Sequence, residues 1–116
     1  MKKFFEKVKE MMKPNYETIT SPILKDWIGE QRPIQLLDVR TLSEIQGGTI
    51  KGSKHADVMS GQLKNAVTQL DKEKDLVVFC RSGNRSKMAC SFLAGQGFEK
   101  VYNLAGGYTD WIKTNG

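Results

Sequence analysis

The chain has 116 residues, 39% of them hydrophobic and 27% charged, which is the size and composition of one globular domain and too short for two. Its net charge of +5 is uneven, because residues 1–13 hold five Lys and two Glu and so carry +3, which leaves +2 for the rest. That remainder is too small for the basic stripe of a nucleic-acid-binding protein, and no apolar stretch approaches the roughly 18 residues of a membrane span.

The N-terminal residues predict a short amphipathic helix that ends before Pro14, because apolar side chains recur at helical spacing: Phe4, Phe5, Val8, Met11 and Met12. We interpret residues 1–15 as an extension that packs on the domain or on a partner. The alternative is a basic helix, residues 2–13, on an anionic membrane surface, and its two Glu weigh against it. Because charged residues follow Phe5 at once, we expect no signal peptide and a cytoplasmic protein with reduced thiols.

The remainder, residues 16–116, is expected to form one domain that begins with a strand, a helix and a second strand. An extended segment over residues 16–20 precedes a helix over residues 23–28, for which Ser21 is the expected N-cap and Pro22 the first helical residue. Residues 34–39 form an apolar run interrupted only by Gln35, which is typical of a strand buried on both faces.

Strands and helices continue to alternate toward the C-terminus. The expected elements are a helix through Leu63, Val67 and Leu70, a strand over 75–80, a helix over 86–96 that Gly97 ends, a strand over 100–103, and a helix around Trp111. Strands that alternate with helices pair in parallel through right-handed crossovers, with helices on both faces. The sequence therefore predicts an α/β fold with a parallel sheet.

A loop of unusual composition follows the strand over residues 75–80. In α/β proteins ligands bind at this place, where a strand turns into the next helix. A cysteine here meets backbone N–H groups, a helix N-terminus and guanidinium charge, all of which favour a thiolate or the anionic outer sulfur of a persulfide. We therefore expect a lowered pKa for Cys80, the cysteine of this loop. The loop consists of Cys80, Arg81, Ser82, Gly83, Asn84, Arg85 and Ser86.

The other candidate side chains receive simpler interpretations. Cys90 falls within a predicted helix between Ala89 and Leu93, so it is expected to pack in the core rather than to act as a resolving thiol. His55 is interpreted as a loop residue without a catalytic role, because a thiolate stabilised by amides needs no adjacent imidazole. Two Cys and one His lack the spacing and the fourth ligand of a zinc site, so we expect neither a metal nor a cofactor.

Four segments carry a pattern that is seen together: 36–40 with Glu44, the turn 48–53, the loop 80–86, and 104–107 with Trp111. Together they resemble the single-domain rhodanese family of sulfurtransferases. Each is a weak signal alone, but they occur in the family's order and spacing, and the resemblance covers residues 16–116. The family often has His and Pro in one turn where this chain has Thr49 and Lys51. We expect these two differences to affect stability slightly.

The resemblance implies a five-stranded parallel sheet between two helical layers and a ping-pong reaction. A donor such as thiosulfate would leave its sulfane sulfur on Cys80, and cyanide, a cellular thiol or a sulfur-accepting protein would remove it. Arg85 would close the loop and help to bind the anionic donor, while Arg81 would flank the entrance. Asp38 and Arg40 would support the loop from a neighbouring strand, although an ordinary surface ion pair with Glu44 is the alternative for Arg40.

Two other functions fit the same fold. A cysteine-dependent phosphatase has five residues between its cysteine and the closing arginine, whereas only four separate Cys80 from Arg85, and the smaller ring suits a sulfur atom better than a phosphate. A non-catalytic sulfur-carrier or regulatory module is the main alternative, ahead of the phosphatase. Such modules are expected to lose the cysteine, so its presence favours catalysis.

Overall fold

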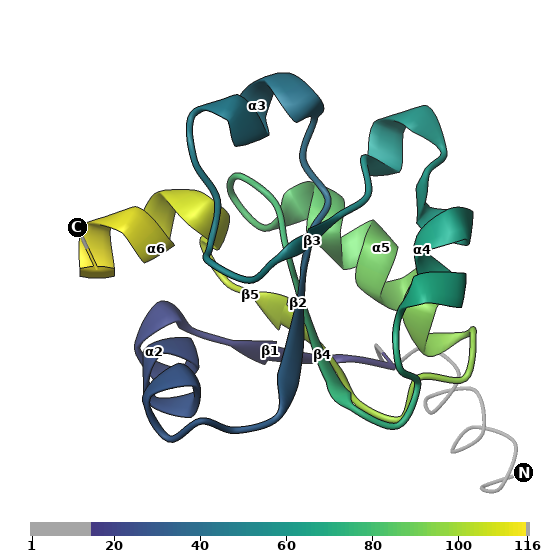
Figure 1. Cartoon of the computed structure of the whole chain (residues 1–116), viewed down its shortest axis with the longest axis horizontal. Coiled ribbons are helices and arrows are strands. Elements are labelled where there is room, and N and C mark those ends of the chain that lie inside the picture. The colour runs from purple at the N-terminus through teal and green to yellow at the C-terminus, as the bar shows by residue number, and fades with distance from the viewer. Residues whose placement is uncertain (1–14, 116) are drawn as a thin grey trace, which may run out of the picture.

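The computed structural model describes residues 15–115, which form a three-layer α/β/α arrangement (Figure 1). Five parallel strands make one sheet in the order β1-β5-β4-β2-β3. The predicted fold class is therefore confirmed, while the helix expected over residues 4–12 lies outside the described residues. The strands are β1 Glu17–Ile19, β2 Ile34–Asp38, β3 Lys54–His55, β4 Asp75–Phe79 and β5 Val101–Leu104.

Helices cover both faces of this sheet. On one face α2 packs beside α6, and on the other α4 and α5 cover the central strands (Figure 1). No helix within residues 15–115 is long and apolar enough to cross a membrane. The helices are α2 Ser21–Gly29, α3 Leu42–Gln46, α4 Leu63–Gln69, α5 Asn84–Ala94 and α6 Gly107–Asn115, with a 3-10 helix η1 at Val58–Ser60.

The core is divided between the two faces of the sheet by the alternation of side chains along each strand. Leu37 and Val78 lie in the cluster under α4 and α5, whereas Leu36 and Val77 lie in the cluster under α2 and α6. Because both faces are covered, β2 and β4 need apolar residues at successive positions. The same alternation places Cys80, directly after β4, on the α5 side.

The helix boundaries differ from the expected ones where capping decides them. The prediction of Ser21 as an N-cap is wrong, because Thr20 is the N-cap and Ser21 is already helical. The α5 helix begins at Asn84, two residues earlier than expected. The five-residue helix α3 was not predicted, and it is held by a capping box in which Thr41 and Glu44 bond each other's backbone N–H groups.

The corner between β5 and α6 lies against the backbone that follows β4. The N–H groups of Tyr108 and Thr109 donate hydrogen bonds to the carbonyl oxygens of Cys80 (2.8 Å) and Arg81 (3.1 Å). This close approach requires Gly107, which has φ of +57° and where a Cβ would come within 2.7 Å of the Arg81 carbonyl carbon. Gly107 therefore fixes the position of α6 against the end of β4.

This contact predicts that Gly107→Ala destabilises the protein more than Gly61→Ala. Gly61 also has positive φ (+74°), but a Cβ there would meet nothing within 4 Å, so its substitution costs only the backbone strain of about 1–3 kcal/mol. Gly107→Ala adds a collision with backbone, worth a further ~1–3 kcal/mol. Urea unfolding of both variants measures the difference, and equal losses would contradict the account.

Candidate functional site

The Cys80 sulfur lies inside the first turn of α5, where backbone N–H groups point at it. Gly83 donates its N–H to Sγ at 3.1 Å and Ser86 donates at 3.4 Å, while the Ser86 hydroxyl oxygen is also 3.4 Å from Sγ. The left-handed conformation of Gly83, with φ of +104°, turns its N–H inward. The geometry suits a sulfur atom that carries negative charge.

The two cysteines are both buried but differ in their ionisation. Burial raises the pKa of the Cys80 thiol, but hydrogen bonds from the Ser86 hydroxyl and from the N–H groups of Ser86, Gly83 and Ser82 outweigh it, so the pKa falls below its ordinary value. Burial, together with the nearby charge of Cys80, raises the pKa of Cys90 to about 12. Cys90 lies in the core cluster as expected.

Asn103 of β5 joins the Cys80 site from the neighbouring strand, a contact that the sequence did not predict. Its side chain is buried, its Oδ1 accepts a hydrogen bond from the Ser86 hydroxyl, and its Nδ2 donates to the Gly83 carbonyl at 3.3 Å. The available signal was one polar residue within an otherwise apolar strand. Asn103 thus contacts both residues whose N–H groups reach the sulfur.

The two arginines of the loop differ in their partners. The Arg85 guanidinium forms two hydrogen bonds with the Glu44 carboxylate, at 2.6 and 2.8 Å, and thereby links α5 to α3. These bonds lower the pKa of Glu44 to about 2 and raise the pKa of Arg85. Arg81 is exposed, and no carboxylate of residues 15–115 lies within ion-pair distance of it.

Asp38 and Arg40 form a buried ion pair at the end of β2. Arg40 is 4% exposed and donates from Nε and Nη2 to the Asp38 carboxylate, and its Nη2 also donates to the Gly48 carbonyl at 2.7 Å. Thr49 donates its hydroxyl to Asp38 at 2.7 Å. The alternative of a surface ion pair between Arg40 and Glu44 is therefore wrong, since the pair is buried and Glu44 binds another arginine.

This buried pair reaches the Cys80 backbone through one aromatic residue. The Arg40 guanidinium carbon lies 4.3 Å from the centre of the Tyr108 ring, and the Tyr108 N–H donates to the Cys80 carbonyl. The contact with the loop is thus indirect. The Nε2 atom of His55 lies 2.7 Å from the carbonyl oxygen of Arg40, so the His55 ring lies beside the end of β2.

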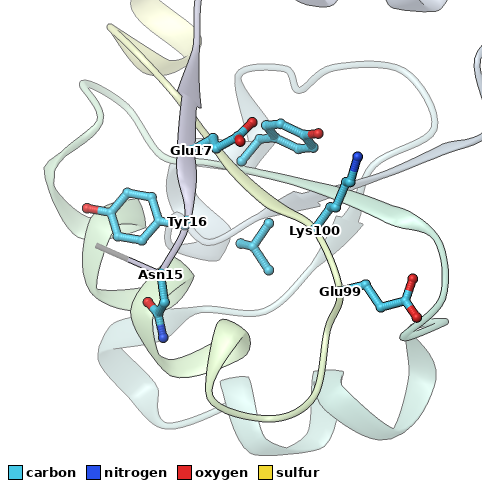
Figure 2. Close-up of a pocket in the computed structure, with 7 residues that line it drawn as sticks. Asn15, Tyr16, Glu17, Glu99 and Lys100 are labelled. Atoms are coloured by element: carbon cyan, nitrogen blue, oxygen red, sulfur yellow. The ribbon is translucent and has the colours of Figure 1, made fainter. Parts of the chain in front are cut away.

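Small cavities lie at both ends of the sheet. One of about 230 Å³ adjoins the loop and is lined in part by Ser82, Lys87 and Asn103. Another of about 240 Å³ lies where β1 and β5 begin, at the end of the sheet away from Cys80, with Glu17 and Lys100 around it (Figure 2). Within residues 15–115 no group of three or more His, Cys, Asp or Glu side chains is placed to hold a metal ion.

Comparison with known proteins identifies the family. The chain is 40% identical over 79 residues to the thiosulfate sulfurtransferase GlpE of Ectopseudomonas mendocina, covering 68% of this chain and 71% of that protein. It is 33% identical over 95 residues to a sulfurtransferase of Allochromatium vinosum, covering 82% and 87%. The structure of the human single-domain sulfurtransferase TSTD1 superposes with a TM-score of 0.73 at 26% identity, covering 83% and 95%. The family model of the rhodanese-like domain matches residues 20–114, and the chain therefore belongs to the rhodanese-like sulfurtransferase family.

Proposed function

We propose that the protein transfers a sulfane sulfur from thiosulfate, or a related persulfide donor, to a thiol or cyanide through a persulfide on Cys80. The observation that carries this proposal is the pair of backbone N–H groups, from Gly83 and Ser86, that point at the Cys80 sulfur. The thiosulfate sulfurtransferase among the relatives supports the same reaction class.

The proposed cycle has two displacements at sulfur. The Cys80 thiolate attacks the outer sulfur of thiosulfate, the sulfur–sulfur bond of the donor breaks, and sulfite leaves with the bonding electron pair. The persulfide now carries its negative charge on the outer sulfur. A thiolate or cyanide attacks that atom, the persulfide bond breaks, and its electron pair returns to Sγ. No outside oxidant or reductant is needed, and the N–H groups of Gly83 and Ser86 face Sγ, which carries the negative charge before the first displacement and after the second.

Arg81 is the proposed contact for the anionic donor. Arg85 is bound on two atoms by Glu44, so much of its charge is already neutralised, and its role in the proposal is to fix the start of α5 to α3. Arg81 lies in the loop, is exposed and forms no ion pair with a carboxylate of residues 15–115. A dianionic donor gains more from an unpaired guanidinium at the entrance than from a paired one.

The remaining site residues are proposed to hold the loop in place. Cys80 is only 1% exposed, so the position of the loop backbone decides whether a small donor can reach its sulfur. Ser82 contributes main chain to the turn between Cys80 and α5, and Asn84 is the first residue of that helix. The ion pair of Asp38 and Arg40 supports α6 through Tyr108, whose N–H holds the Cys80 carbonyl.

Cys80→Ser is expected to abolish thiocyanate formation from thiosulfate and cyanide, because the alcohol neither ionises at neutral pH nor accepts a sulfane sulfur. Cys90→Ala is the matched control and should retain activity, since that thiol is buried with a pKa of about 12. A colorimetric assay of thiocyanate measures both. Equal loss in the two variants would contradict the assignment, and no activity in the unaltered protein would favour the non-catalytic module.

Arg81→Gln is expected to raise the KM for thiosulfate about tenfold with a smaller change in kcat, which corresponds to about 1.4 kcal/mol of lost attraction between charges in partly aqueous surroundings. Lys100→Gln removes the same charge at the far end of the sheet, beside the cavity in Figure 2, and should leave the KM unchanged. Steady-state kinetics at low ionic strength compare them. If only Arg85→Gln raised the KM, with its fold intact, Arg85 would be the donor contact.

The link between α3 and α5 predicts a pH-dependent contribution to stability. The pKa of Glu44 falls from 4.5 to about 2 on folding, so the stabilisation is complete above about pH 4.5 and is lost as the pH falls toward 2. Glu44→Gln should therefore lower the free energy of unfolding by roughly 0.5–1 kcal/mol at neutral pH, a value limited by solvent screening, and by much less near pH 2, where the carboxylate is already partly protonated in the folded protein. Urea unfolding across this range, with Glu99→Gln as the exposed control, measures it. A difference that stayed constant with pH would contradict the prediction.

A further inference from the structure

Asn103 occupies an unusual place for an amide side chain. It lies on β5 in register with Val78 of β4, and it is 1% exposed on the face of the sheet that α5 covers. A buried amide is costly unless its donors and acceptors are used. Both ends of this amide bind the Cys80 loop: Oδ1 accepts from the Ser86 hydroxyl, and Nδ2 donates to the Gly83 carbonyl.

The Ser86 hydroxyl has one proton and two neighbours that can accept it. Its oxygen is 3.4 Å from the Cys80 sulfur, and it donates to Asn103 Oδ1. A neutral Cys80 thiol can itself donate to the Ser86 oxygen, which leaves the serine proton with Asn103. A thiolate has no proton to give and attracts the hydroxyl proton to itself. The direction of this hydrogen bond therefore depends on where the negative charge lies.

We propose that Asn103 is a positioning residue for Cys80: its amide holds Gly83 and Ser86 in place, and its Oδ1 competes with the Cys80 sulfur for the hydrogen bond that the Ser86 hydroxyl donates during the reaction cycle. In the thiolate state the hydroxyl donates to Sγ. In the persulfide state the charge has moved to the outer sulfur, and the hydroxyl returns to Asn103. This inference rests on the proposed function, because it assigns to Cys80 the charge states of sulfur transfer.

The side chain at position 103 has to be an amide for this role. An amide of this length offers, at neutral charge, a separate acceptor for the Ser86 hydroxyl and a separate donor for the Gly83 carbonyl. Aspartate has the same shape, but once ionised it lacks the donor, holds the serine proton more firmly and places a second negative charge near the thiolate. Within residues 15–115, Arg85 and Cys90, both on α5, also interact electrostatically with Cys80.

Asn103→Asp tests the proposal through the rate at which iodoacetamide alkylates Cys80 as a function of pH. Peptide mapping of the full chain separates Cys80 from Cys90. We expect the midpoint of the profile to rise by about one pH unit or more, while the rate on the high-pH plateau stays unchanged. Asn65→Asp, on the exposed surface of α4, is the matched control and should leave the midpoint in place.

The Ser86→Ala background separates competition for the Ser86 hydrogen bond from simple charge repulsion between the introduced carboxylate and the Cys80 thiolate. If Asn103 acts through Ser86, the shift caused by Asn103→Asp becomes clearly smaller in that background. An equal shift of the midpoint in both backgrounds would overturn the proposal. So would an alkylation rate of Cys80 that Asn103→Asp lowers at every pH, including the high-pH plateau. Ser86→Ala alone should raise the midpoint, because the thiolate loses its hydroxyl donor. An unchanged midpoint there would also overturn it, even if Asn103→Asp failed to fold.

Alkylation needs no sulfur donor, so this experiment is independent of the proposed reaction. If the alkylation midpoints shift as predicted but the protein does not consume thiosulfate, the positioning role of Asn103 stands and the sulfurtransferase proposal is rejected. Normal thiosulfate consumption with no shift in the alkylation profile would do the reverse.

Discussion

The hydrogen bonds from the backbone N–H groups of Gly83 and Ser86 to the Cys80 sulfur are the interaction on which the site depends. Cys90, ten residues later, is the comparison: it is also buried, but no N–H group within residues 15–115 donates a hydrogen bond to its sulfur. Burial, with the neighbouring charge of Cys80, raises the pKa of Cys90 to about 12, whereas the donors around Cys80 outweigh its burial and lower its pKa. A sulfur in a dry site can thus be an inert part of the core or a nucleophile, and the direction of a few amides decides which.

The rest of the fold keeps those amides in place. The carbonyl of Cys80 is held by the N–H of Tyr108, and α6 can approach that closely only because Gly107 has no side chain. The buried pair of Asp38 and Arg40 lies behind Tyr108, and Asn103 ties the loop to β5. Three strands that are distant in sequence therefore support the backbone around one sulfur atom, which explains why polar residues are buried at the carboxyl ends of β2 and β5.

The sequence predicted the parts of this arrangement that are local. The apolar runs of β2 and β4 and the composition of the loop each lie within a few residues, so the α/β class and the candidate nucleophile could be inferred. Contacts between distant residues could not. The partner of Arg85 is 41 residues away, and Asn103 meets Ser86 only because parallel pairing places β5 beside β4. The five-residue α3 and two-residue β3 are too short to show a period.

The most direct test of the central claim is the mass of the intact protein after incubation with thiosulfate and removal of excess donor. If the donors around Cys80 stabilise an anionic outer sulfur, the protein gains the mass of one sulfur atom, peptide mapping places it on Cys80, and cyanide removes it. An unchanged mass, or an added sulfur on Cys90 instead, would contradict the account.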